Sequence, residues 1–257
     1  MTYVIAGIAA LFGALIGSFL NVLIFRIPKK EEFVKTPSHC MTCGHRLAWY
    51  DLFPLLSWLS LGGKCRYCKT KLSPQYPLVE AANALCWFAV FAWYLPADGL
   101  EPLELLYPLL LSLMCSSLLA LSVIDFRTYE IPVGFNIFIG CLGAVRLLLN
   151  LSSWMDSLIG MLCISLPLLL IFLVSKGRAI GGGDVKLMAA CGFLIGWQKI
   201  CFAFLAGCIL GSVIHSIRMK RSGADHILAM GPYLSLGVFL SLFLCDPFVE
   251  WYISLLV

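Results

Sequence analysis

Long runs of uncharged apolar residues recur along this chain, separated by short polar stretches. Only 12% of its 257 residues are charged, against roughly 25% in an ordinary soluble domain. A run of ~20 apolar residues is long enough to cross a bilayer as a helix. The pattern excludes a soluble globule, a disordered tail and a small disulfide-linked scaffold. It predicts an all-α, polytopic membrane protein.

We predict eight membrane spans from these runs. The spans are placed at residues 3–25, 78–95, 104–124, 132–149, 156–175, 184–198, 199–217 and 230–246. The sixth span is short, and its boundary with the seventh is the least well defined. The chain then divides into a first transmembrane helix (1–25), a cytoplasmic insert (26–77) and a seven-helix membrane domain (78–257).

The positions of the basic residues predict the orientation of the spans. Sixteen of the 18 Lys and Arg residues fall in four alternate connections, 26–77, 125–131, 176–186 and 218–229. Only Arg146 and Lys199 fall on the other side, where the connection 96–103 carries Asp98 and Glu101. The positive-inside rule therefore places the four connections in the cytoplasm and both termini outside it.

Four cysteines in the insert form two CxxC motifs, Cys40-Met-Thr-Cys43 and Cys65-Arg-Tyr-Cys68. Their separation of 21 residues lies just beyond the usual window for paired CxxC zinc sites and resembles that of zinc ribbons. A tight turn aims both sulfurs of each motif at one tetrahedral ion, and neighbouring Lys and Arg favour thiolates. The insert is too small to bury a core of its own, which favours a structural zinc site with four cysteine ligands.

Free thiols or two disulfides are the alternatives, and a cytoplasmic location disfavours disulfides. A catalytic zinc is disfavoured because four thiolates leave no open position for water. His39 and His45 flank the first motif and are interpreted as surface residues. Eight further cysteines stand singly in apolar runs and are interpreted as small hydrophobic residues: Cys86, Cys115, Cys141, Cys163, Cys191, Cys201, Cys208 and Cys245.

Two aspartates lie at the edges of predicted spans. Asp125 ends the third span, and Asp184 begins the sixth in Gly181-Gly-Gly-Asp184. The topology puts both at the cytoplasmic face, and a carboxylate near hydrocarbon is a candidate functional group by default. A paired-carboxylate hydrolase needs one ionised group to activate water and one protonated group to polarise the carbonyl. The glycines before Asp184 would permit close approach of a substrate backbone and bending of the chain.

Structural roles for the same aspartates remain open at this stage. Asp184 at a helix start could be an N-cap, and Asp125 could pair locally with Arg127. A catalytic pair is favoured over these structural roles, because both aspartates are predicted at the same depth in the membrane and three glycines precede Asp184. Glu130 is a weaker third acid because it lies in the connection itself.

The chain resembles the type IV prepilin peptidases, which are bifunctional leader peptidases and N-methyltransferases. The resemblance covers nearly the whole chain. It rests on Gly17-Ser-Phe-Leu-Asn-Val22, Arg26-Ile-Pro28, the two CxxC motifs, Tyr76-Pro-Leu-Val-Glu80, Ile124-Asp125, Ile131-Pro132, Gly181-Gly-Gly-Asp184-Val-Lys-Leu187 and Gly231-Pro-Tyr233. After Tyr50-Asp51 the family commonly continues Asn-Ile-Pro, whereas this chain has Leu52-Phe53-Pro54.

The resemblance implies an aspartic protease of the GxGD type, with Asp125 and Asp184 as its catalytic pair. It implies cleavage of the basic leader of type IV prepilins or type II secretion pseudopilins, followed by methylation of the new N-terminal residue from S-adenosylmethionine. The cysteine-containing insert resembles the part associated with methyl transfer. No residue pattern locates the methyl donor, for which Asn21 and Glu80 are candidates. Helix packing for Asn21 and a solvated acid at the membrane edge for Glu80 are at least equally plausible roles.

The resemblance places the protein in the bacterial cytoplasmic membrane with its active site facing the cytoplasm. Phe126, Tyr129 and Phe135 are candidates for contact with the substrate beside the scissile bond. Membrane lipid is the expected partner of the insert's net charge of +6, nine basic minus three acidic residues. We expect no nucleic-acid partner, and the oligomeric state stays open. The alternative functions are a proton- or cation-coupled transporter that uses the two acids, and a zinc-dependent assembly factor.

Overall fold

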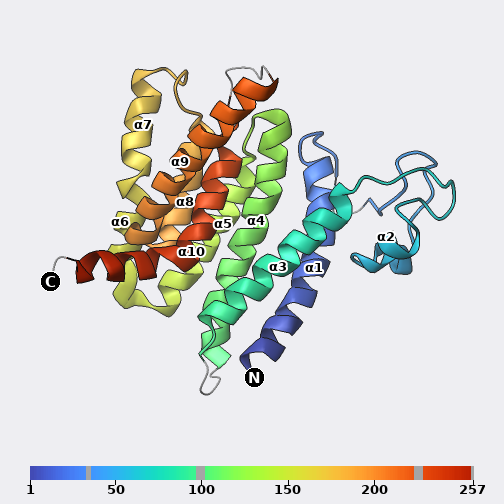
Figure 1. Cartoon of the computed structure of the whole chain (residues 1–257), viewed down its shortest axis with the longest axis horizontal. Coiled ribbons are helices and arrows are strands. Elements are labelled where there is room, and N and C mark those ends of the chain that lie inside the picture. The colour runs from blue at the N-terminus through green and yellow to red at the C-terminus, as the bar shows by residue number, and fades with distance from the viewer. Residues whose placement is uncertain (33–35, 97–101, 223–227, 256–257) are drawn as a thin grey trace. The chain divides into compact units, whose positions relative to one another are not determined.

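The computed structural model describes residues 1–32, 36–96, 102–222 and 228–255 (Figure 1). Within these residues the regular structure is helical, and the two isolated β-bridges, His39 with Arg46 and Lys64 with Lys71, lie in the insert. The all-α prediction is confirmed. The chain forms two compact units, Met1–Ala120 and Leu121–Val257. The predicted division at residues 25 and 77 stays a prediction.

The longer helices follow the apolar runs. They are α1 (Thr2–Arg26), α3 (Gln75–Tyr94), α4 (Leu106–Thr128), α5 (Val133–Leu149), α6 (Trp154–Cys163), α7 (Ser165–Val174), α8 (Gly182–Ile195), α9 (Trp197–Ser222) and α10 (Gly231–Ser254). The short helices are η1 (Trp49–Leu52), α2 (Leu56–Ser60), η2 (Pro102–Leu105) and η3 (Leu151–Ser153).

Every predicted span coincides with helix, although the count of eight spans stays a prediction. Among the described residues, five stretches are long and apolar enough to cross a membrane: Thr2–Arg26, Leu106–Thr128, Leu151–Val174, Trp197–Lys220 and Gly231–Ser254. Helix α5 is apolar but shorter. Helix α8 has 14 residues and spans about 21 Å at ~1.5 Å per residue, less than a bilayer core of roughly 30 Å.

The predicted spans differ in detail from the helices at three places. The boundary between the sixth and seventh spans, predicted at residue 198, lies at Gly196, between α8 and α9. The fifth span is interrupted at Ile164, between α6 and α7. Pro167 explains the break, because its nitrogen cannot donate to the carbonyl of Cys163 and its ring collides with that turn. The eighth was expected to end at residue 246, yet α10 continues to Ser254 with Pro247 inside it and bends near the C-terminus (Figure 1).

Part of the charge pattern lies outside the described residues. The structure does not describe Asp98 and Glu101 of the acidic connection. Of the 18 basic residues, it does not describe Lys35 or the side chain of Arg221.

The two cations predicted on the opposite side of the membrane are both paired with acids. Arg146 lies 3.4 Å from Asp156, and Lys199 lies 2.8 Å from Asp246. Each ion pair lowers the free energy of placing a charged side chain at the end of a membrane helix.

In the first unit, α1 and α3 pack closely through small residues. A side chain at Gly13 would place its Cβ 2.8 Å from the Trp87 ring, so only glycine permits this approach. Asn83 donates to the Gly13 carbonyl over 2.7 Å and accepts from the Ser116 hydroxyl over 2.9 Å. Buried hydrogen bonds of this kind join α1, α3 and the first part of α4 and satisfy polar groups enclosed between the helices.

In the second unit, α8 is surrounded by other helices. It packs against α5, α6, α7 and α9, and the backbones of α6 and α8 approach closely where Gly160 faces Gly192. Eight of its 14 residues are buried: Val185, Leu187, Met188, Ala190, Cys191, Gly192, Leu194 and Ile195. Burial within protein on most sides fixes the helix that carries Asp184.

Candidate active site and cysteine cluster

Asp125 lies in the last two turns of α4 and is only 4% exposed. Its Oδ2 accepts a hydrogen bond from the backbone N–H of Gly231, the first residue of α10, over 2.9 Å. A Cβ at position 231 would lie 2.6 Å from the same oxygen. Position 231 therefore needs glycine, so that the start of α10 can hold the carboxylate in place.

Asp184 is the third residue of α8 and is half-buried. The N-cap of this helix is Gly181, so the interpretation of Asp184 as an N-cap is wrong. Gly182 and Gly183 lie inside the first turn of α8, and a Cβ at Gly183 would lie 3.0 Å from Cβ of Ile131. At Gly183 the missing side chain therefore lets α8 approach the segment that follows α4.

The two aspartates lie close enough to interact within the second unit. The charge of Asp125 acts on Asp184, which places the two carboxyl groups within electrostatic reach. They come from helices separated by more than fifty residues of chain, and both lie at helix ends. Two carboxyl groups within electrostatic reach of each other oppose each other's ionisation, which is the condition for one to act as base and the other as acid.

Aromatic side chains and one cation gather at the end of α4, the helix that carries Asp125. Phe126, Tyr129, Arg218 and Tyr233 line a small hollow together with Leu228 and Ala229, and the Arg218 guanidinium lies 5.2 Å from the centre of the Phe126 ring. Phe126 and Tyr129 are exposed, as a substrate contact requires, whereas Phe135 is buried in α5. Glu130 is exposed.

Arg218, Tyr233 and the N–H of Gly231 were not identified as site groups from sequence. Gly231-Pro-Tyr233 was the available signal, because this motif is part of the family resemblance.

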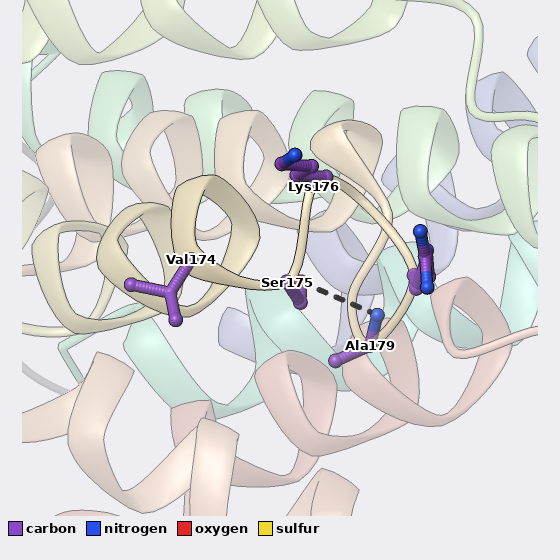
Figure 2. Close-up of a pocket in the computed structure, with 5 residues that line it drawn as sticks. Val174, Ser175, Lys176 and Ala179 are labelled. Carbon is purple, nitrogen blue, oxygen red and sulfur yellow. Dashed lines mark hydrogen bonds between the residues drawn. The ribbon is translucent and has the colours of Figure 1, made fainter.

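A larger open hollow of about 480 Å³ lies in the loop between α7 and α8. Figure 2 shows its lining residues, Val174, Ser175, Lys176, Arg178 and Ala179. The N–H of Ala179 donates to the Ser175 hydroxyl over 3.4 Å, and Lys176 and Gly177 both have positive φ. The chain turns and bends at residues 175–180, ahead of the three glycines, and Gly182 and Gly183 are already helical.

The four cysteines of the insert come together in the first unit. The sulfurs of Cys40, Cys43, Cys65 and Cys68 all lie within 4.8 Å of one another, and Cys40 Sγ lies 3.8 Å from Cys68 Sγ. Four sulfurs about 2.3 Å from a central zinc would be separated by about 3.8 Å in a tetrahedron. The separations fit a four-thiolate metal site better than two disulfides, and all four thiols are free.

The two CxxC motifs have matching backbones. The N–H of Cys40 donates to the His45 carbonyl, and the N–H of Cys65 donates to the Thr70 carbonyl, each over 2.9 Å. The residue after each second cysteine, Gly44 or Lys69, has positive φ. The Thr70 side chain lowers the pKa of Cys68 to about 6, which favours the thiolate that binds metal. His39 and His45 are exposed and do not belong to the cluster.

Asn21 and Glu80, the candidates for methyl-donor contact, are buried near the insert. Asn21 donates to the Gly17 and Tyr76 carbonyls over 3.3 and 3.2 Å. Glu80 Oε2 accepts from the N–H of Leu55 over 2.8 Å. Both side chains thus tie α1 and the insert to α3, which gives each a structural role.

The fold and the site together define a polytopic helical membrane protein with a pair of interacting aspartates and a four-cysteine insert. Residues 112–216 match the type IV leader peptidase family, and residues 11–94 match the bacterial peptidase A24 N-terminal domain. The chain belongs to this family.

Three relatives described as prepilin leader peptidase/N-methyltransferase illustrate the similarity. The Pseudomonas aeruginosa protein is 31% identical over 95% of this chain and 92% of its own length. The Pectobacterium carotovorum protein is 32% identical over 90% of each chain. The Myxococcus xanthus protein is 33% identical over 82% of this chain and 62% of its own length. No solved structure matches the chain.

Proposed function

We propose that this protein cleaves the leader of type IV prepilins or pseudopilins and then N-methylates the new N-terminal residue. The relatives named above carry both activities in their descriptions. The observation that carries the proposal is the pairing of Asp125 with Asp184, two acids distant in sequence that interact within one unit. Both fall inside the leader-peptidase match, and all four clustered cysteines fall inside the N-terminal match.

Asp125 and Asp184 are the proposed catalytic pair. One carboxylate takes a proton from water, whose oxygen adds to the scissile carbonyl, while the other carboxyl donates a proton to the carbonyl oxygen. Collapse of the tetrahedral intermediate breaks the C–N bond, and the departing amine takes up a proton from the pair. The Gly231 N–H holds Asp125 in position for both steps.

The substrate lies with its leader in the cytoplasm and its apolar segment in the bilayer. Lys and Arg enrichment in alternate connections supports this orientation in the bacterial inner membrane. The exposed rings of Phe126 and Tyr129, beside Asp125, are placed to contact the substrate near the scissile bond.

Cys40, Cys43, Cys65 and Cys68 hold a structural zinc ion in this proposal. Zinc supplies a fixed tetrahedral centre that joins the two CxxC turns, since neither turn has a core of its own. The insert contributes to methyl transfer, and S-adenosylmethionine supplies the activated methyl group. The amine released by cleavage is the methyl acceptor.

Incubation of the purified protein with a prepilin and methyl-labelled S-adenosylmethionine tests both activities at once. We expect a shortened pilin that carries the label at its N-terminus. Label on uncleaved prepilin, or a shortened pilin without label, would refute the coupling of the two steps. A transporter or an assembly factor would give neither product, and the family relationship lends no support to the transporter alternative.

Replacement of Gly231 tests the positioning of Asp125. Gly231→Ala would bring a methyl group within 2.6 Å of Asp125 Oδ2 and displace the carboxylate. We expect leader cleavage to slow by about 10²-fold, the scale of a misplacement near 1 Å, while methylation of an already cleaved pilin is unchanged. Gly140→Ala is the control, because nothing lies within 4 Å of its added carbon. Equal cleavage rates for the two variants would contradict the positioning role.

A further inference from the structure

A short segment of the insert exposes large apolar side chains. Five residues of η1, α2 and the turn between them define this apolar patch: Trp49, Leu52, Phe53, Leu56 and Leu59. Trp49 is 77% exposed, and Leu56 and Leu59 are 61% and 63% exposed. Contiguous exposed apolar groups of this size mark an interaction surface.

The inner side of the same segment is fixed to the second CxxC motif. The Trp58 ring packs on Gly63, where a Cβ would lie 2.8 Å from the ring. Asp51 Oδ1 accepts from Arg66 Nε over 2.7 Å, and Arg66 lies between the cysteines of the motif. The segment is therefore anchored at both ends, and its apolar side chains point outward from an ordered support.

A third anchor ties the segment to helix α3. The N–H of Leu55 donates to Glu80 Oε2 over 2.8 Å, and Leu55 has a φ of 59°, which a residue with a side chain adopts only when its surroundings impose it. Glu80 follows the start of α3 at Gln75 by five residues, or about 7.5 Å along the helix.

The same unit includes a helix that is long and apolar enough to span a membrane. Helix α1 exposes Phe12, Leu15 and Phe19, each at least half exposed, so its outer face is suited to lipid. Lys64, Lys69 and Lys71 are exposed on the second CxxC motif. An apolar face flanked by lysines is typical of segments that lie in the interfacial region of an anionic bilayer.

We propose that the apolar patch docks into the boundary between lipid headgroups and acyl chains. The insert then lies against the bilayer, with η1 and α2 in the interface. This docking is independent of the proteolytic role of the aspartates, because every contact that carries it lies in the first unit.

Photo-crosslinking in vesicles tests the proposal on the full chain. Phe53→p-benzoylphenylalanine preserves a large apolar ring, and Met41→p-benzoylphenylalanine, at a residue 68% exposed on the first CxxC motif, is the matched control. Each variant is reconstituted into phosphatidylethanolamine and phosphatidylglycerol vesicles and irradiated. We expect about tenfold more phospholipid adduct, measured by intact mass, at position 53 than at position 41.

A second pair of variants tests the patch as a whole. In the Phe53 crosslinking background, Leu56→Glu with Leu59→Glu should lower the adduct yield by about tenfold, whereas Ser60→Glu should leave it unchanged. Zinc content is measured in each variant to show that the insert remains folded.

Equal lipid adducts at positions 53 and 41 would overturn the proposal, as would their absence at both. Crosslinks from position 53 to a second copy of the chain, or to added prepilin in place of lipid, would assign the patch to a protein partner and overturn it equally.

Discussion

Asp125→Asn and Asp184→Asn are each expected to slow leader cleavage by about 10³-fold, within the range that general acid–base catalysis contributes. Asparagine keeps the shape of the side chain but can neither take a proton from water nor give one to the carbonyl. In Asp125→Asn the side-chain amide oxygen can still accept the hydrogen bond from the Gly231 N–H, so the fold should persist. The measurement is the initial rate of cleavage of a purified prepilin in detergent or vesicles.

Two controls separate catalysis from structure in this experiment. Glu130→Gln should cleave at the wild-type rate, because Glu130 is exposed and outside the pair. Methylation of a pilin supplied without its leader should be unchanged in both asparagine variants. If either variant cleaved at the wild-type rate, the pair would not be the catalytic one.

The second large effect concerns the cysteine cluster. Cys65→Ser removes one of the four proposed zinc ligands, and structural zinc contributes roughly 10–16 kcal/mol to the folding of zinc-finger peptides. We expect the zinc content to fall from about one ion per chain to near zero, the insert to become sensitive to protease, and methyl transfer to be lost. Zinc content is measured by inductively coupled plasma mass spectrometry.

Cys141→Ser is the matched control, since Cys141 is an exposed free thiol outside the cluster. It should retain both zinc and methyl transfer. Unchanged zinc content in Cys65→Ser would contradict the metal site. Leader cleavage is expected to survive in Cys65→Ser, because the aspartates lie in the other unit.

Much of the fold was predictable because apolar runs leave a chain in lipid few alternatives to helix. The break at Ile164 was also within reach of the sequence, since Pro167 three residues later forbids a continuous turn. The short α8 was harder to interpret. Its 14 residues are tolerated because other helices surround it, and packing of that kind is not visible in a hydropathy pattern.

The candidate site also has a part that the sequence could predict and a part that depends on tertiary contacts. Asp125 and Asp184 could be selected from the rarity of charge in apolar surroundings, and the four cysteines from their spacing. The contact from Gly231 to Asp125 could not be derived from spacing, because it joins residues 106 positions apart. The exposure of the apolar patch on η1 and α2 was also not predicted. The sequence of an apolar segment does not show whether its side chains are buried or exposed until the neighbouring elements are known.

The central claim is that Asp125 and Asp184 act on one bond as a single unit, and a double-mutant cycle tests it most directly. Cleavage of one prepilin is measured with the wild-type protein, each asparagine variant, and the variant that carries both changes. We predict that the double variant is about as slow as either single variant, because removing one member already disables the pair. Losses that multiply, to about 10⁶-fold in the double variant, would show two independent groups and contradict the account.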